Sequence, residues 1–147
     1  MRRSRGFTLI ELLLVIALIA IASALVTTAL RDPEEAQLHA DAARLSALLE
    51  AARAEARATG VAAYFELRRS DQDYAFRFVG LGAVGDWPSQ WLQAGVSAEI
   101  VGARRLTLGP EPVIGAQRIQ LRLGERRLSL VTDGLAPFAV ADGAASP

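Results

Sequence analysis

The chain has 147 residues, of which 52% are hydrophobic and 22% are charged, and its 16 basic and 16 acidic residues balance. A neutral total charge gives no sign of a nucleic-acid or membrane-surface partner, while a mean hydropathy of +0.26 indicates a buried or membrane-inserted segment. The absence of cysteine excludes disulfides, thiolate nucleophiles and thiolate metal sites. The single histidine, His39, likewise excludes metal centres built from several histidines.

Residues 7–30 form a mainly apolar run in which Glu11 is the only charged residue, and a basic start with Arg2, Arg3 and Arg5 precedes it. As a helix this run measures roughly 36 Å, enough to cross about 30 Å of hydrocarbon. The basic residues should keep the start of the chain in the cytoplasm and place the C-terminal part outside. A removable secretory signal and a generic anchor are two alternatives, but neither explains a carboxylate that costs on the order of 2–3 kcal/mol in an apolar helix.

The segment Arg5-Gly6-Phe7-Thr8-Leu9-Ile10-Glu11 resembles the prepilin signal of type IV pilins and type II secretion pseudopilins. The resemblance implies that a membrane prepilin peptidase cuts between Gly6 and Phe7 and that the new N-terminal Phe7 is methylated. Residues 1–6 would then be the leader peptide. The resemblance also implies that Glu11 is an assembly residue, because pairing with the ammonium of Phe7 on a neighbouring subunit would offset the desolvation of its carboxylate.

A second helix is predicted from Pro33 to Thr59. Asp32 suits the N-cap, Pro33 suits the first helical position, and Gly60 is a natural stop. Between them lies no glycine or further proline, and Ala, Leu, Glu and Arg dominate, which are all strong helix formers. The sequence leaves open whether Pro33 kinks one long helix or only starts a new one.

The predicted second helix is amphipathic. Its apolar residues recur every three or four positions and form one stripe: Leu38, Ala42, Leu45, Leu49, Ala52 and Ala56. Charged residues, Asp41 and Arg53 among them, are expected mainly off this stripe. We therefore expect residues 7–31 to form a transmembrane or filament-core helix that is apolar all round, and residues 32–60 to pack against a globular domain.

The sequence pattern changes from helix to strand after Gly60. Strand-like segments, separated by polar turns or by glycine and proline, lie at residues 61–68, 74–79, 96–108, 117–123, 127–131 and 138–140. They predict an α+β fold in which the amphipathic helix covers an antiparallel β-sheet or a small β-sandwich. The globular β domain would span residues 61–141, and residues 142–147 would form a flexible tail.

Two further segments favour one branch of the pilin-like family. The run Leu48-Leu49-Glu50-Ala51-Ala52-Arg53-Ala54-Glu55-Ala56, with Thr59-Gly60 and a strand behind it, resembles the GspH/FimT branch. The late pair of Leu128–Thr132 and Asp133-Gly134 resembles the same branch. Its members are the H-type minor pseudopilins of type II secretion and their type IV pilus relatives.

The resemblance implies a structural subunit of the periplasmic pseudopilus of a type II protein secretion system, rather than an enzyme. Such a subunit is a single-pass protein of the bacterial inner membrane, with a cytoplasmic N-terminus and a periplasmic C-terminal domain. Its implied partners are the prepilin peptidase, other major and minor pseudopilins, inner-membrane lipid and the inner-membrane secretion platform. No catalytic motif is visible in the sequence, and neither a cofactor nor a metal is expected.

A minor type IV pilin, FimT-like and able to bind DNA, is the alternative function. Arg118 and Arg122 fall on one face of a predicted strand, and Arg126 and Arg127 follow in the hairpin. Arg104 and Arg105 are candidates to join them in a basic patch that binds phosphate. A solvated strand face explains the same arginines without any DNA.

Trp87 and Trp91 lie in a segment rich in glycine that also contains a proline. Tryptophan is enriched at the energetic centres of interfaces, so both residues are candidates for a partner contact of the soluble domain. The alternative is structural, with one or both tryptophans closing the edge of the hydrophobic core.

Overall fold

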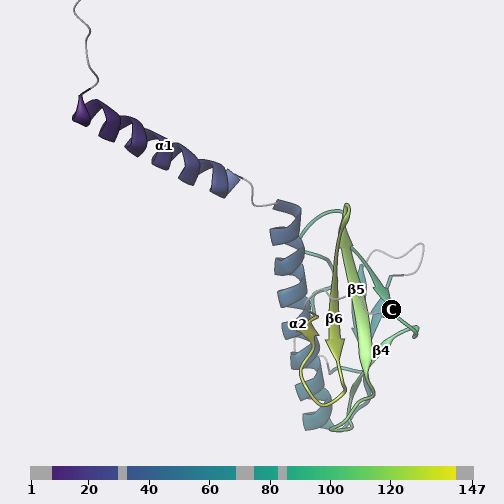
Figure 1. Ribbon diagram of the computed structural model, residues 1–147. Helices are drawn as coiled ribbons and strands as arrows, with labels where there is room; N and C mark the ends of the chain where they lie inside the picture. Colours follow the sequence, from purple (N-terminus) through teal and green to yellow (C-terminus); the bar gives the residue numbers. More distant parts are fainter. Residues whose placement is uncertain (1–7, 30–32, 69–74, 83–85, 142–147) are drawn as a thin grey trace, which may run out of the picture. The chain divides into compact units, whose positions relative to one another are not determined.

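The computed structural model describes residues 8–29, 33–68, 75–82 and 86–141, and for residues 22–29 it describes the backbone alone. The chain divides into two compact units, Met1–Pro33 and Glu34–Pro147, and Figure 1 shows the order of their elements. The second unit contains every residue of the hydrophobic core, from Leu38 to Phe138. It therefore holds the packing that it needs to fold without the first unit.

The first unit consists of helix α1, Leu9–Ala29. Thr8 begins the helix, because its carbonyl and hydroxyl oxygens both accept the N–H of Glu11, at 3.1 and 3.3 Å. Every described side chain from Leu9 to Ile21 is exposed in the single chain. Within the residues that the structure describes, no helix combines the length and the apolar character that a membrane crossing needs. The span expected over residues 7–31 includes three residues outside that description.

Helix α2, Pro33–Thr59, belongs to the second unit from Glu34 onward, and its bounds match the prediction. At its end Gly60 has φ 70°, and its N–H donates to the carbonyl of Ala56 at 2.9 Å, which is the expected C-terminal stop. The six residues of the predicted apolar stripe are all buried. Asp32, the predicted N-cap, lies outside the described residues.

The strands of the second unit form two antiparallel sheets. Their bounds are β1 Ala63–Leu67, β2 Phe76–Val79, β3 Ser97–Ile100, β4 Leu106–Gly109, β5 Gln117–Leu123, β6 Arg126–Thr132 and β7 Ala139–Val140. In the described part of the chain, one sheet has the order β2-β1-β4 and the other has the order β3-β5-β6-β7. The predicted α+β fold, a helix packed on antiparallel sheets, is confirmed.

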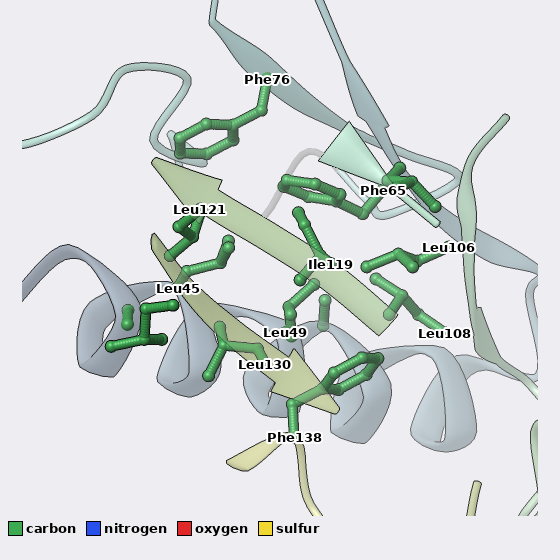
Figure 2. Packing of buried hydrophobic residues seen from close by; sticks show 14 of the residues in the cluster. Leu45, Leu49, Phe65, Phe76, Leu106, Leu108, Ile119, Leu121, Leu130 and Phe138 are labelled. Carbon is green, nitrogen blue, oxygen red and sulfur yellow. The ribbon is translucent and has the colours of Figure 1, made fainter. Parts of the chain in front are cut away.

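The hydrophobic core lies between α2 and the inner faces of both sheets. Figure 2 shows Leu45 and Leu49 of α2 reaching toward Ile119 of β5 and Leu130 of β6. Phe65 of β1 is also fully buried in the same cluster. Alternation along the strands places such residues inward and their neighbours outward, as a half-buried sheet requires.

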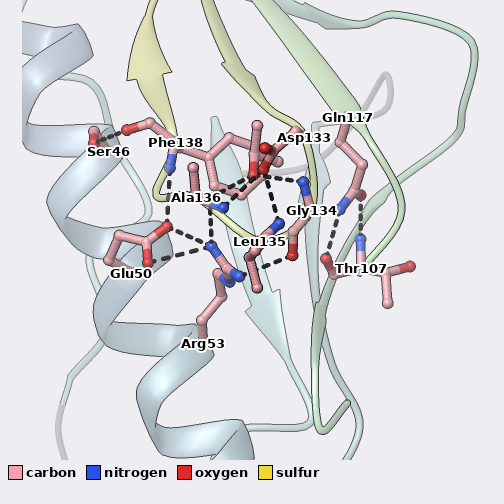
Figure 3. A network of polar contacts seen from close by, with 11 residues as sticks. Ser46, Glu50, Arg53, Thr107, Gln117, Asp133, Gly134, Leu135, Ala136 and Phe138 are labelled. Carbon is pink, nitrogen blue, oxygen red and sulfur yellow. Dashed lines mark hydrogen bonds and ion pairs between the residues drawn. The ribbon is translucent and has the colours of Figure 1, made fainter. Parts of the chain in front are cut away.

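A side chain joins the two sheets where β4 meets β5. The amide of Gln117 accepts the N–H of Thr107 at 2.7 Å and donates to the carbonyl of Thr107 at 2.8 Å (Figure 3). Gln117 therefore supplies the hydrogen bonds that a neighbouring strand would otherwise offer to this edge. Such pairing covers part of an edge that could otherwise pair with another chain.

Candidate functional site

The predicted processing and assembly residues cluster at the start of the chain, and the structure describes one of them. Gly6 and Phe7 lie outside the described residues. Glu11 lies in the first turn of α1 with its side chain exposed. The spacing from Thr8 to Glu11 is that of a capping box, a sequence signal that also identifies Thr8 as the residue that begins the helix. Glu11 is thus placed where a carboxylate interacts favourably with the helix dipole.

Both tryptophans pack against aromatic residues of β2. The ring centroids of Trp91 and Phe76 are 4.7 Å apart, and those of Trp87 and Phe78 are 4.9 Å apart. Each tryptophan is half-buried. Such packing is expected of side chains that close the edge of the hydrophobic core. Part of each ring is exposed, and the contact of Trp87 and Trp91 with a partner stays a prediction.

Two of the four candidate basic residues lie between β3 and β4. Arg104 is exposed there. The guanidinium of Arg105 lies 3.6 Å from the centre of the Tyr64 ring, and one of its nitrogens lies 3.9 Å from a carboxylate oxygen of Glu66. Arg105 is thus engaged with β1, which belongs to the smaller sheet.

The other two candidate basic residues lie on β5, in the larger sheet. Arg118 and Arg122 are both exposed, and because they are four residues apart they share its outer face. The strand register places Val131 opposite Arg118 and Arg127 opposite Arg122. The structure therefore brings Arg122 together with Arg127, one of the two arginines that the sequence places in the hairpin after this strand.

Charged side chains on one flank of α2 hold the loop that carries the tryptophans. Asp41 is buried, with 1% of its surface exposed, and its carboxylate accepts the N–H groups of Leu92 and Gln93 at 2.8 and 3.2 Å. Arg44 donates to the carbonyl of Gln90 at 2.9 Å. Asp41 lies beside the apolar stripe and not on it, as expected, but it is buried there because two backbone N–H groups distant in sequence compensate the burial of its charge.

Three side chains on a second flank of α2 hold the segment that follows β6 (Figure 3). Arg53, with 2% of its surface exposed, donates to the carbonyls of Gly134 and Ala136 at 3.2 and 3.1 Å. Glu50 pairs with Arg53 at 3.0 Å and accepts the N–H of Phe138 at 3.0 Å. The hydroxyl of Ser46 donates to the carbonyl of Phe138. Arg53 thus also lies beside the apolar stripe and is buried there, because backbone carbonyls distant in sequence accept its hydrogen bonds.

The turn after β6 is built by Asp133 and Gly134. The carboxylate of Asp133 accepts the N–H groups of Ala136 and Leu135 at 2.7 and 2.9 Å. These two hydrogen bonds, that of Ala136 first, hold the pKa of Asp133 below its usual value of 3.8. The turn predicted from the sequence is present, and its carboxylate fixes the segment that α2 holds from the other side.

The outward face of α2 is lined by small residues. Seven exposed alanines follow one another at spacings of four and three: Ala36, Ala40, Ala43, Ala47, Ala51, Ala54 and Ala58. The 3.6-residue period of a helix places them in one line. This line of alanines can be read from the sequence, but a pattern defined by large apolar residues does not include it.

Comparison with known proteins gives one match. Residues 1–27 match the family model of the prokaryotic N-terminal methylation motif. The chain carries a prepilin-like methylation motif. Such a motif implies processing by a prepilin peptidase, anchoring through the N-terminus and assembly with other pilin-like subunits. No curated protein and no solved structure matches the chain.

Among the residues that the structure describes, no group of three or more Asp, Glu or His side chains is placed to hold a metal ion. The buried charged groups, Asp41 and Arg53, are both bonded to backbone atoms of their own chain. They position segments of the fold.

Proposed function

We propose that this protein is a minor pseudopilin of a type II protein secretion system: a structural subunit of the periplasmic pseudopilus, without enzymatic activity. One observation carries the proposal, the match of residues 1–27 to the methylation motif. The side chains described in α1, from Leu9 to Ile21, are all exposed, and all of them except Glu11 are apolar. A surface of this kind needs lipid or other apolar helices around it.

In the proposed mechanism, the prepilin peptidase removes residues 1–6 and leaves the apolar helix attached to the chain. The helix holds the subunit in the inner membrane until assembly, and neighbouring helices then replace the lipid. Glu11 would pair with the methylated ammonium of Phe7 on a neighbouring subunit. Mutual pairing is what makes a carboxylate tolerable in such surroundings.

Features of the second unit support the GspH/FimT branch. A helix covers antiparallel sheets, and the turn at Asp133-Gly134 is fastened to that helix by Arg53 and Glu50. The line of exposed alanines on α2 offers a smooth face to other subunits. A minor type IV pilin remains the alternative, since it would share these features.

The mature N-terminus tests the proposal directly. Mass spectrometry of the protein from membranes should find a chain that begins with methylated Phe7. Gly6→Val should leave the precursor uncut, because only a small side chain is expected to fit beside the bond to be cleaved, whereas Gly6→Ala should still be cut. A mature chain that begins near Leu25 would instead show an ordinary secretory signal.

A second experiment separates the two systems and tests Glu11. Deletion of the gene in the source bacterium should abolish secretion of exoproteins, and loss of twitching or DNA uptake alone would favour the pilin alternative. Glu11→Gln should be cleaved normally but be absent from sheared filaments. Normal incorporation of Glu11→Gln would contradict the assembly role of this carboxylate.

A further inference from the structure

The hairpin of β5 and β6 presents two arginines side by side. Arg122 and Arg127 are directly opposite in the strand register, and both side chains are exposed. Leu123 and Arg126 close the two-residue turn, so they form the hydrogen-bonded pair of the hairpin. The next pair, Arg122 and Arg127, is then of the closer kind, with Cα atoms about 4.5 Å apart.

The described residues supply no counter-ion for these two arginines. Glu99 lies near Arg122 on the outer face of the sheet, but it forms no ion pair with either arginine among the described residues. Arg122 uses its Nε to donate to the carbonyl of Gly124 at 3.1 Å, which fixes the direction of its guanidinium. Like charges directly opposite each other destabilise a pair of strands.

An open hollow of about 300 Å³ lies over the two arginines. Its lining comes from β3, β5 and β6: Ser97, Ala98, Glu99, Gln120, Arg122 and Arg127. Ser97 is opposite Arg122 in the register, so the two residues share the outer face of the sheet. The hollow thus combines two cations with a hydroxyl and an amide group that can donate hydrogen bonds to an anion, and with one carboxylate, that of Glu99.

We propose that Arg122 and Arg127 bind one carboxylate of an acidic side chain on a partner protein. The planar guanidinium fits a carboxylate in a two-point contact, and one anion between two arginines removes the repulsion that the hairpin otherwise carries. A long phosphate backbone fits less well, because Glu99 and Glu125 flank the pair and would repel adjoining phosphates. The inference rests on the proposed function in one respect: a filament subunit contacts other subunits, and one of these would supply the carboxylate.

Residues 33–147, which contain the whole core, provide the protein for the test. Capped tetraglutamate is titrated at low salt while the Nε–H signals of the arginines are followed by NMR. We expect the signals of Arg122 and Arg127 to shift with millimolar affinity, and Arg122→Gln or Arg127→Gln to weaken binding about tenfold. Tetraglutamine should cause no shift.

Arg118→Gln is the matched control, since it removes the same charge from the same strand face where the neighbour is Val131. It should leave both binding and the melting temperature nearly unchanged. Arg127→Gln should raise the melting temperature by about 1–3 °C at low salt, and this gain should disappear at high salt. The change in melting temperature is measured without any ligand.

Three results would overturn the inference. In the first, tetraglutamate shifts the Nε–H signal of neither Arg122 nor Arg127. In the second, Arg118→Gln weakens binding as much as Arg127→Gln does. In the third, a short oligothymidylate binds more tightly than the peptide and loses affinity with Arg127→Gln, which would assign the pair to nucleic acid. None of these results bears on cleavage after Gly6, so the proposed function stands or fails separately.

Discussion

At the scale of single residues, Gly134 is the glycine, among those that the structure describes, that least tolerates a side chain. Its φ is 100°, and an added Cβ would lie 1.5 Å from the carbonyl oxygen of Ile114. Gly134→Ala should therefore lower the free energy of unfolding of residues 33–147 by about 2–4 kcal/mol, measured by urea denaturation. Gly102→Ala is the control, because its φ is 76° but nothing lies within 4 Å of the added atom. It should cost about 1 kcal/mol, and equal losses would show that the clash at Gly134 relaxes.

Asp133 predicts an acid dependence of stability. Its folded pKa is lowered by the N–H groups of Ala136 and Leu135. The stability that it contributes is therefore complete above the unfolded pKa, near 3.8, and is lost as the pH falls through the folded pKa. The melting temperature of Asp133→Ala should lie below that of the parent at neutral pH, and the two should converge in acid. A difference that persists unchanged to pH 2 would contradict this account.

At the scale of elements, the polar flank of α2 should matter as much as its apolar stripe. Arg53→Met removes the donors to Gly134 and Ala136 and leaves Glu50 without its cation. We expect a loss of about 2–4 kcal/mol in the free energy of unfolding, measured by urea denaturation. Arg57→Met, one turn later and exposed, is the matched control and should change stability by less than about 0.5 kcal/mol. Similar losses of unfolding free energy in both variants would show that the effect comes from helix propensity and not from the hydrogen bonds of Arg53.

The elements themselves were largely predictable, because local patterns determine them. The bounds of α2 follow from Pro33 and Gly60, and the alternation of residues 117–123 returns as β5. What was not predictable depends on contacts between distant segments. The pairing of β1 with β4, the bridge from Gln117 to Thr107 and the burial of Arg53 each need a partner that no local period reveals.

The same distinction applies to the candidate site. The prepilin-like signal is local and was found from seven consecutive residues, and the match to residues 1–27 supports it. The pairing of Arg122 with Arg127 depends on the register of a hairpin. A prediction of strands without their register cannot say whether Arg126 or Arg127 is the neighbour of Arg122. A shift of one residue would move every side chain of the strand to the other face of the sheet.

At the scale of the whole molecule, the second unit should fold without α1. Residues 33–147 should melt in one cooperative transition, because the core lies entirely within them. Leu49→Asp places a charge at a fully buried position and should cost several kcal/mol or prevent folding. Ala47→Asp, on the exposed face of the same helix, should be nearly neutral. If Leu49→Asp melts like the parent, the apolar stripe does not form the core.

The fastening of α2 along two flanks has a mechanical consequence. Asp41 holds the loop at residues 92–93, and Arg53 holds the segment at residues 134–136, about three turns further along the helix. A pull along the helix axis would load these bonds together in shear, because they are spread along its length. Peeling the sheets away from one end of α2 would instead break the hydrogen bonds of Asp41 and Arg53 one after the other. The domain should therefore resist a pull along the axis of α2 better than it resists peeling of the sheets from one end of that helix.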